Sequence, residues 1–413
     1  MPEFRAGSKP ITLKGTTGAD VFYGGTADVT FVGNGGMDLY YGGSRKSTVD
    51  FSTINGSISV NLSYDGWQNT GAAGFNRFVR IDGFIGTRLP DRVLGSNSDD
   101  SLRGEGGDDY IWGGYGSDAL FGGEGNDTLE GGTGNDTIAG GNGNDVLRGE
   151  IGDDVLKGEN GSDRLDGGFG KDIMDGGAGD DILYGGPGSD TIVGGPGRDT
   201  VDYSASLRIV MNRKDASGYW YTGDAQGDLL VEIERLILSA FDDEFTAWHE
   251  AWEVFGGAGH DKLTGSGGRD YLDGGDGDDV LKGGQENDTL LGGPGKDRID
   301  GGTGTDSLRG GPGADIFVFG AGSSTVAHPD TIGDFERGDR IDLSAIDARP
   351  GGADNAFSFI GSRAFSGSGA ELAVRARPGG GWLVSADTDG DRQPDFALIV
   401  LGPAAPVASD FVL

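Results

Sequence analysis

Aspartate recurs in this chain at a spacing that could build metal sites. One aspartate falls on every ninth position from Asp91 onward, and an apolar side chain follows each by two residues, as Leu102 follows Asp100. This run comprises Asp91, Asp100, Asp109, Asp118, Asp127, Asp136, Asp145, Asp154, Asp163, Asp172, Asp181, Asp190 and Asp199. A second run of equal spacing, with Trp252 where one aspartate is lost, comprises Asp243, Asp261, Asp270, Asp279, Asp288, Asp297, Asp306 and Asp315. A weaker run near the N-terminus keeps Asp20 and Asp38.

The residues around each aspartate predict a turn followed by a short strand. The best unit, Gly122–Glu130, reads GGEGNDTLE. Glycine tolerates positive φ, so the first six residues of a unit favour a turn. The last three favour a strand with one inward side chain, because strand side chains alternate between faces. Two units would make one coil of 18 residues, and successive coils would stack as two parallel sheets, about 4.8 Å apart per coil.

Such stacking brings each aspartate close to the one in the next coil, where bare carboxylates would repel each other. Calcium would remove the conflict, because it takes six to eight oxygen ligands in flexible geometry, whereas magnesium demands a tighter octahedron. Soft metals are disfavoured, since the chain has no cysteine and only three histidines. One ion per stacked pair of turns predicts roughly 18 calcium ions. Their charge would be close in size to the formal net charge of −35.

The composition excludes several classes of protein. The chain has 413 residues, of which 85 are glycine, 67 are acidic and 32 are lysine or arginine. A nucleic-acid-binding protein needs a basic face, and no apolar run approaches the roughly 18 residues of a membrane-spanning helix. The absence of cysteine excludes disulfides. A disordered acidic tail has a similar composition, but it has no reason to keep a nine-residue register.

Two interruptions divide the repeats, and they look duplicated. Val49-Asp50-Phe51-Ser52 matches Val201-Asp202-Tyr203-Ser204, and the aspartate register resumes at equal distances, at Asp91 and Asp243. Each interruption carries an alternating run that reads as short strands bulging from the stack. The predicted order is an N-terminal extension or tag (1–14), degenerate repeats (15–50), a spacer (51–85), thirteen repeats (86–202), a second spacer (203–237), nine repeats (238–319) and a C-terminal cap (320–413).

The nine-residue pattern G-G-x-G-x-D-x-U-x resembles that of the calcium-binding RTX repeat proteins. Residues 328–347, HPDTIGDFERGDRIDLSAID, resemble the C-terminal domain of serralysin-type secreted metalloproteases. The chain end, Asp410-Phe411-Val412-Leu413, resembles the signal read by type I ABC exporters. The resemblance implies an all-β fold, a right-handed parallel β-roll of two sheets interrupted by the duplicated spacers and closed by a β cap. It also implies export to the extracellular space or cell surface without an N-terminal signal.

A separate aspartate cluster lies in the C-terminal segment. Asp387, Asp389 and Asp391 fit the serralysin-type domain and resemble the start of an EF-hand loop. Gly390 stands at the fourth position of this loop instead of the sixth, so a metal site and a plain aspartate-rich turn both stay open. We expect the four C-terminal residues to contribute little burial, because chain ends are commonly disordered.

The chain offers little for catalysis. His249-Glu250 lacks the second histidine of the zinc motif H-E-x-x-H, and no G-x-S-x-G pentapeptide occurs. We therefore expect a secreted, non-catalytic calcium-binding protein with calcium as its cofactor. One alternative is a surface-layer, adhesion or glycan-binding protein that holds cell-surface polysaccharide on Trp67 and Trp220, although these side chains could simply cover the spacers' own cores. The other is the folding and secretion part of an enzyme whose catalytic domain lies outside this chain.

Overall fold

The computed structural model describes residues 1–413 except 214–218, 248–250 and 347–356. The described residues form β-strands and three short 3-10 helices, at Gly71–Ala73, Gly223–Ala225 and Ala408–Asp410. The chain divides into two compact units. The first contains Met1–Val201 and Asp224–Ile233, and the second contains Asp202–Gly223 and Glu234–Leu413.

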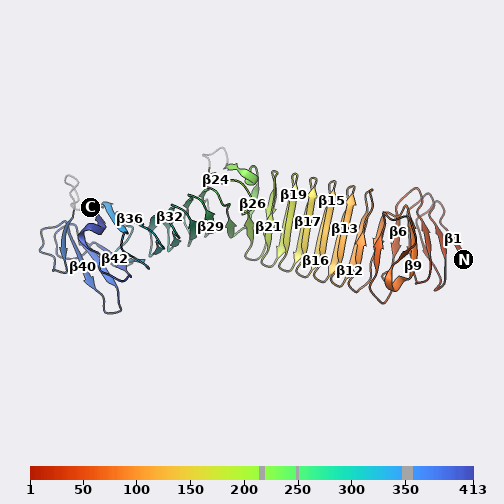
Figure 1. Ribbon diagram of the computed structural model, residues 1–413, viewed down its shortest axis with the longest axis horizontal. Coiled ribbons are helices and arrows are strands. Elements are labelled where there is room, and N and C mark those ends of the chain that lie inside the picture. The colour runs from red at the N-terminus through yellow and green to blue at the C-terminus, as the bar shows by residue number, and fades with distance from the viewer. Residues whose placement is uncertain (214–218, 248–250, 347–356) are drawn as a thin grey trace. The chain divides into compact units, whose positions relative to one another are not determined.

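The first unit is a parallel solenoid (Figure 1). One sheet has the order β2 (Ile11–Lys14), β4 (Val29–Val32), β6 (Ser47–Asp50), β10 (Gly83–Ile85), β12 (Ser101–Gly106), β14 (Ala119–Glu124), β16 (Thr137–Asn142), β18 (Val155–Asn160), β20 (Ile173–Ala178), β22 (Thr191–Val193), β26 (Leu229–Val231). A second has the order β7 (Ser59–Asn61), β11 (Arg92–Leu94), β13 (Tyr110–Tyr115), β15 (Thr128–Thr133), β17 (Val146–Ile151), β19 (Arg164–Phe169), β21 (Ile182–Tyr184), β23 (Thr200–Asp202). A third, at the N-terminal end, has the order β1 (Glu3–Arg5), β3 (Val21–Tyr23), β5 (Leu39–Tyr41), β9 (Phe75–Val79), β8 (Gln68–Asn69).

The register of these strands follows from the nine-residue repeat. Strands alternate between two sheets, so each pairs with the strand 18 residues later, as Leu102 pairs with Leu120 and Leu120 with Ile138. Each unit buries one apolar residue, and Leu120, Leu129 and Ile138 are 0% exposed. The parallel β-roll and its thin core are therefore confirmed.

The N-terminal end departs from this pattern in two ways. Residues 3–5 and 11–14, expected to be an extension or tag, form the strands β1 and β2 of the stack. The core here is aromatic instead of aliphatic. The rings of Phe4, Phe22, Tyr40 and Phe78 stack in succession, with centroids 5.1, 4.9 and 5.4 Å apart.

The spacers contribute strands to the stack, whereas the sequence suggested that they bulge from it. In the first spacer, β9 pairs with β5, and β10 lies between β6 and β12 in the same sheet. The strand β7 opens the next sheet by pairing with β11. In the second spacer, β26 pairs with β22. Each spacer thus supplies rungs of the solenoid with irregular connections between them.

The second unit contains another parallel roll and an antiparallel cap. One sheet has the order β27 (Arg235–Ile237), β29 (Glu253–Ala258), β31 (Tyr271–Asp276), β33 (Thr289–Leu291), β35 (Ser307–Arg309), β37 (Asp330–Ile332), β42 (Phe396–Val400), β41 (Trp382–Asp387), β40 (Glu371–Ala376), β39 (Ser358–Gly361). The other has the order β25 (Tyr219–Thr222), β24 (Val210–Arg213), β28 (Glu244–Thr246), β30 (Lys262–Thr264), β32 (Val280–Gln285), β34 (Arg298–Thr303), β36 (Ile316–Gly320), β38 (Arg340–Ala345), β43 (Phe411–Val412).

The chain end is less exposed than we expected. Phe411 pairs with Ile341 in β38, is 8% exposed and lies 5.7 Å from the ring of Phe359. The strand β43 therefore covers the last coil, and this expectation was wrong because an apolar residue at the terminus finds an open sheet edge.

Candidate metal sites

The repeat aspartates form continuous columns along the rolls. In each column the backbone N–H of one aspartate donates to Oδ1 of the aspartate in the next coil. Asp109 N–H donates to Asp127 Oδ1 and Asp127 N–H to Asp145 Oδ1, both at 2.7 Å. The same contact measures 2.9 Å between Asp279 and Asp297. One carboxylate oxygen of each such aspartate, as in Asp127, Asp145 and Asp297, therefore ties two coils together.

The second carboxylate oxygen is buried and accepts no hydrogen bond along most of the columns. This holds for Oδ2 of Asp109, Asp118, Asp127, Asp136, Asp145, Asp154, Asp163, Asp172, Asp181, Asp190, Asp261, Asp279, Asp288, Asp297, Asp306, Asp315 and Asp330, and for Oδ1 of Asp100. A buried carboxylate oxygen without a partner is costly, because it has lost water and gained nothing. A cation is the partner that such a row of oxygens lacks.

The first glycine of each unit leaves room beside these oxygens. A Cβ added to Gly122 would lie 2.2 Å from Asp127 Oδ2 and 2.6 Å from the carbonyl oxygen of Gly140, one coil on. A Cβ at Gly149 would lie 2.4 Å from both Asp154 Oδ2 and the Gly167 carbonyl oxygen. Carboxylate and carbonyl oxygens thus converge on a space that only glycine keeps free. An all-oxygen donor set of this kind fits calcium.

Burial also raises the pKa values of the column. Desolvation is the main cause, and it raises the pKa of Asp109 and of Asp288 to about 8 and that of Asp145 to about 7. The neighbouring aspartates in the column add to the increase. Without a cation the fold therefore disfavours the ionised carboxylates on which calcium binding depends.

In six of the expected site residues, Oδ2 already accepts a hydrogen bond from the protein. These are Asp20, Asp38, Asp91, Asp100, Asp243 and Asp270. Asp38 accepts from the Asp20 N–H at 2.9 Å and from the Tyr40 hydroxyl at 3.1 Å. The other five accept from the residue four positions earlier, as Asp270 Oδ2 does from Ser266 N–H at 3.0 Å.

Further acidic residues extend the columns beyond the expected set. Asp190 N–H donates to Asp228 Oδ1 at 2.9 Å, across the second spacer. Asp306 and Asp315 N–H groups donate to Oδ1 of Asp330 and Asp339, at 2.8 and 3.1 Å. Asp330 and Asp339 are nine residues apart, and an apolar residue follows each by two, as in the repeats. They lie 24 residues after Asp306 and Asp315 instead of 18, so the nine-residue register of the preceding block does not reach them. No pattern in the sequence marks Asp228.

The C-terminal aspartate cluster contains one residue other than those expected. Asp387, Asp389 and Asp395 bring one carboxylate oxygen each within 4.8 Å of one another, and Asp391 is not part of this group. Asp387 accepts from the N–H groups of Gly390 and Arg392, at 2.7 and 3.1 Å. These hydrogen bonds account for an aspartate-rich turn, and metal binding there stays a prediction.

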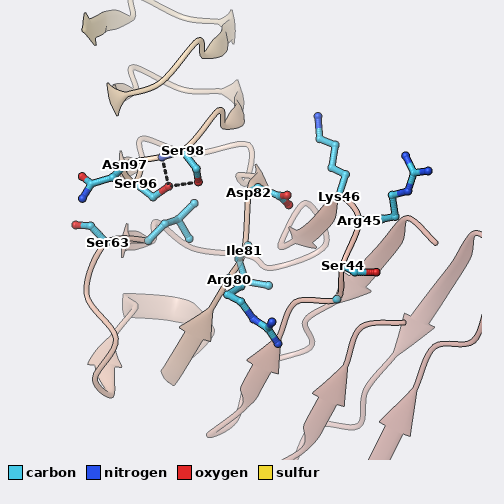
Figure 2. A pocket seen from close by; sticks show the side chains of 12 residues that line it. Ser44, Arg45, Lys46, Ser63, Arg80, Ile81, Asp82, Ser96, Asn97 and Ser98 are labelled. Carbon is cyan, nitrogen blue, oxygen red and sulfur yellow. Dashed lines mark hydrogen bonds between the residues drawn. The ribbon is translucent and has the colours of Figure 1, made fainter. Parts of the chain in front are cut away.

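A pocket of the first unit lies beside the first spacer. It has a volume of about 550 Å³ and is lined in part by Arg45, Lys46, Arg80 and Asp82. Figure 2 shows the three basic side chains pointing in different directions, so they do not converge on one ligand. The pocket therefore suggests no catalytic or anion-binding site.

The other sequence candidates fall partly outside the described residues. His249 and Glu250 lie there, and nothing is described of the Trp220 side chain. Trp67 is 40% exposed, so it does not simply fill the core of its spacer. Along the described part of the chain, no helix is long and apolar enough to cross a membrane.

Comparison with known proteins agrees with this geometry. The model of the RTX calcium-binding nonapeptide repeat matches overlapping stretches within 14–44 and 85–201, and that of the peptidase M10 serralysin C terminal matches 250–413. Fold and site define a calcium-binding β-roll protein. More specifically, the chain is a secreted RTX repeat protein with a serralysin-type C-terminal domain. Both matches are to repeat and secretion domains, and neither is to a catalytic domain.

Similarity to individual proteins is low. No curated protein matches the chain. Among solved structures, the crystal structure of the extracellular lipase LipA from Serratia marcescens is 14% identical, with a TM-score of 0.19. The match covers 78% of this chain and 40% of the lipase, so the chain spans well under half the length of that protein.

Proposed function

We propose that this protein is a non-catalytic calcium-binding protein that folds when it binds many calcium ions after type I export. The observation that carries the proposal is the row of buried, unpartnered carboxylate oxygens along the columns. The fold creates these oxygens and offers them no hydrogen-bond donor. Calcium would supply the positive charge that they lack.

The residues of the chain explain why folding would depend on the ion. An aspartate in the middle of a column, such as Asp145, holds the previous coil through Oδ1 and presents Oδ2 to the space that the first glycine of its unit keeps free. The core adds one buried apolar residue per unit, which is little to oppose the repulsion within a chain of net charge −35. The free energy of ion binding would therefore become free energy of folding.

This dependence also suits export. Free calcium is scarce inside cells, so the weak sites would stay empty there and the chain would remain unfolded. Outside the cell, calcium would fill the columns and fold the chain. The end of the chain, Asp410–Leu413, would serve as the signal for the exporter.

The proposal is tested by circular dichroism of the full chain in EGTA, in millimolar calcium and in equal magnesium. We expect an unfolded, expanded chain in EGTA and a cooperative gain of β-structure with calcium. Magnesium should not replace calcium, because it demands tighter octahedral geometry and retains its water. A chain that is β-structured and melts cooperatively in EGTA at pH 8, where protons no longer neutralise the columns, would contradict the proposal.

A second candidate function is binding of a surface polysaccharide, favoured by exposed aromatic rings in the first spacer. Tyr64, Trp67 and Phe75 are 54%, 40% and 49% exposed. Exposed aromatic faces can stack on sugars, being apolar and rigid. The test is a glycan array with the calcium-loaded protein and its Trp67→Ala variant. Binding that the variant loses would support this candidate, and no binding by either would remove it.

A further inference from the structure

Among the residues that the structure describes, five turns of the rolls are closed, which means that a backbone N–H of the turn occupies Oδ2 of the turn's own aspartate. All five have serine or threonine four residues before the aspartate, at position two of the unit. The backbone N–H of this residue donates to Oδ2 of the aspartate. The pairs are Thr16 with Asp20, Thr87 with Asp91 and Ser96 with Asp100, each at 2.6 Å, Ser239 with Asp243 at 2.8 Å and Ser266 with Asp270 at 3.0 Å. In two of them the hydroxyl also reaches the same oxygen, from Thr16 at 3.0 Å and from Ser239 at 2.9 Å.

The open turns have a different backbone at position two. Glycine stands there in most of them, with a φ of +119° at Gly123 and +93° at Gly275. The Gly275 N–H turns away from the aspartate and donates to the Gly292 carbonyl oxygen at 3.1 Å. None of the five serine and threonine residues has a positive φ.

Glycine alone does not explain the open turns. Glu105, Glu150 and Glu159 also stand at position two, and their φ values are +78°, +72° and +76°. A positive φ costs an L-residue roughly 1–2 kcal/mol. The chain nevertheless adopts it at these three glutamates, and Oδ2 of the corresponding aspartates is unpartnered. The open state is thus a property of the turn conformation.

The closed turns also share a position in the columns. Strand register places Pro2, Ile58, Ile209 and Trp252 one coil before Asp20, Asp91, Asp243 and Asp270, so the preceding turn carries no carboxylate there. Every aspartate with an unpartnered Oδ2 instead follows another aspartate in its column. The exception among the closed turns is Asp100, which follows Asp82.

We propose that serine or threonine at position two closes a turn to calcium, replacing the ion with hydrogen-bond donors where a column lacks a second carboxylate. The inference rests on the proposed calcium binding and specifies which of the repeat aspartates take part in it. In Asp20, Asp91, Asp100, Asp243 and Asp270, Oδ2 is then satisfied by a hydrogen-bond donor and not by an ion. Calcium then begins at the next aspartate of the column where that aspartate has an unpartnered Oδ2, as Asp109 has after Asp91.

Ser96 provides the sharpest test, because Asp82 already supplies a carboxylate one coil before Asp100. Ser96 N–H closes its turn on Asp100 Oδ2 at 2.6 Å. The Ser96 hydroxyl makes separate contacts, since its Oγ accepts from Ser98 N–H at 3.2 Å and lies 2.9 Å from the Ser98 hydroxyl oxygen (Figure 2). In Ser96→Gly the residue at position two can adopt a positive φ. In the matched control, Ser96→Ala, the hydroxyl is lost but the closed backbone is kept. Native mass spectrometry in saturating calcium should count one more ion in Ser96→Gly than in the wild type, and no change in Ser96→Ala. Equal counts in the two variants would overturn the inference.

A second pair of variants keeps the test independent of whether Ser96→Gly folds. Asp91→Ala should leave the ion count unchanged, because its turn is closed by Thr87. Asp109→Ala, one coil later, should lose at least one ion. A lost ion in Asp91→Ala would overturn the inference. A wild-type chain that binds no calcium at all would instead refute the proposed function.

Discussion

At the scale of single residues, each repeat aspartate has two separate tasks. Oδ1 of Asp145 accepts the Asp127 N–H at 2.7 Å, while its Oδ2 is buried without a partner. Replacing Asp145 with alanine would leave a buried N–H unsatisfied, at a cost of about 1–3 kcal/mol, and would remove a ligand from the middle of a column.

We therefore expect Asp145→Ala to raise the calcium midpoint of folding more than Asp91→Ala does. Asp91 starts its column and is closed by Thr87, and in a one-dimensional stack each unit contacts mainly its neighbours. Calcium titrations followed by circular dichroism would measure both midpoints. A larger shift for the terminal substitution would contradict this account of the column.

The raised pKa values predict how the metal-free fold depends on pH. Burial raises the pKa of Asp109 to about 8 from an ordinary value of 3.8. Between these values the folded chain binds protons that the unfolded chain does not. The free energy of unfolding in EGTA should therefore fall as pH rises from about 4 to about 8, and should be recovered on acidification.

Thermal melts in EGTA at pH 5 and pH 8 would measure this dependence. We expect more β-structure and a higher melting temperature at pH 5, where protons neutralise the column in place of calcium. Calcium affinity should be lower at pH 5 than at pH 8, because protons compete with calcium for the same oxygens. A melting temperature that rises with pH in EGTA would show that the carboxylates are not buried as described.

At the scale of elements, the nonapeptide pattern predicts the rolls well and the connections poorly. The pairing of Leu120 with Ile138 follows directly from a period of nine, because two units make one rung. The pairing of β22 with β26, and the contact of Asp190 with Asp228, join residues 38 apart across a spacer. Such pairings depend on how the spacer folds, and no local periodicity records them.

The same reasoning explains what was missed in the metal sites. Spacing places an aspartate in each turn but does not reveal the sign of φ four residues earlier, which determines whether Oδ2 is open or hydrogen-bonded. Ser266 and Gly275 look interchangeable in a turn sequence, yet only Gly275 has a positive φ. Likewise, the loop folds so that Asp395, and not Asp391, joins Asp387 and Asp389.

The C-terminal cap is an element whose removal can be predicted. Truncation after Phe319 would expose Phe317 and Phe319, which are 0% and 1% exposed, and would bare the edges of β35 and β36. Open strand edges promote pairing between chains. The truncated chain should bind calcium more weakly or aggregate, as measured by calcium titration and sedimentation velocity. A monomeric truncated chain with unchanged affinity would show that the roll needs no cap.

At the scale of the whole molecule, the proposed function makes both folding and export of one chain depend on calcium. The columns carry much of the net charge of −35, and burial makes that charge costly until a cation is bound. Export and folding are therefore separable only where a residue serves the exporter and contributes little to the roll. The last four residues come closest to this, although Phe411 is largely buried.

Deleting Asp410–Leu413 should block secretion through a type I exporter while calcium-induced folding survives. The deletion removes the pairing of β43 with β38 and the burial of Phe411, worth about 1.5–3 kcal/mol, so a lower melting temperature is expected but not loss of the fold. Phe411→Ala is the matched control, because it loses the same burial and keeps the chain end. If secretion tracked stability alone, both variants would be secreted equally. Normal secretion of the deletion variant would show that these residues only resemble an export signal.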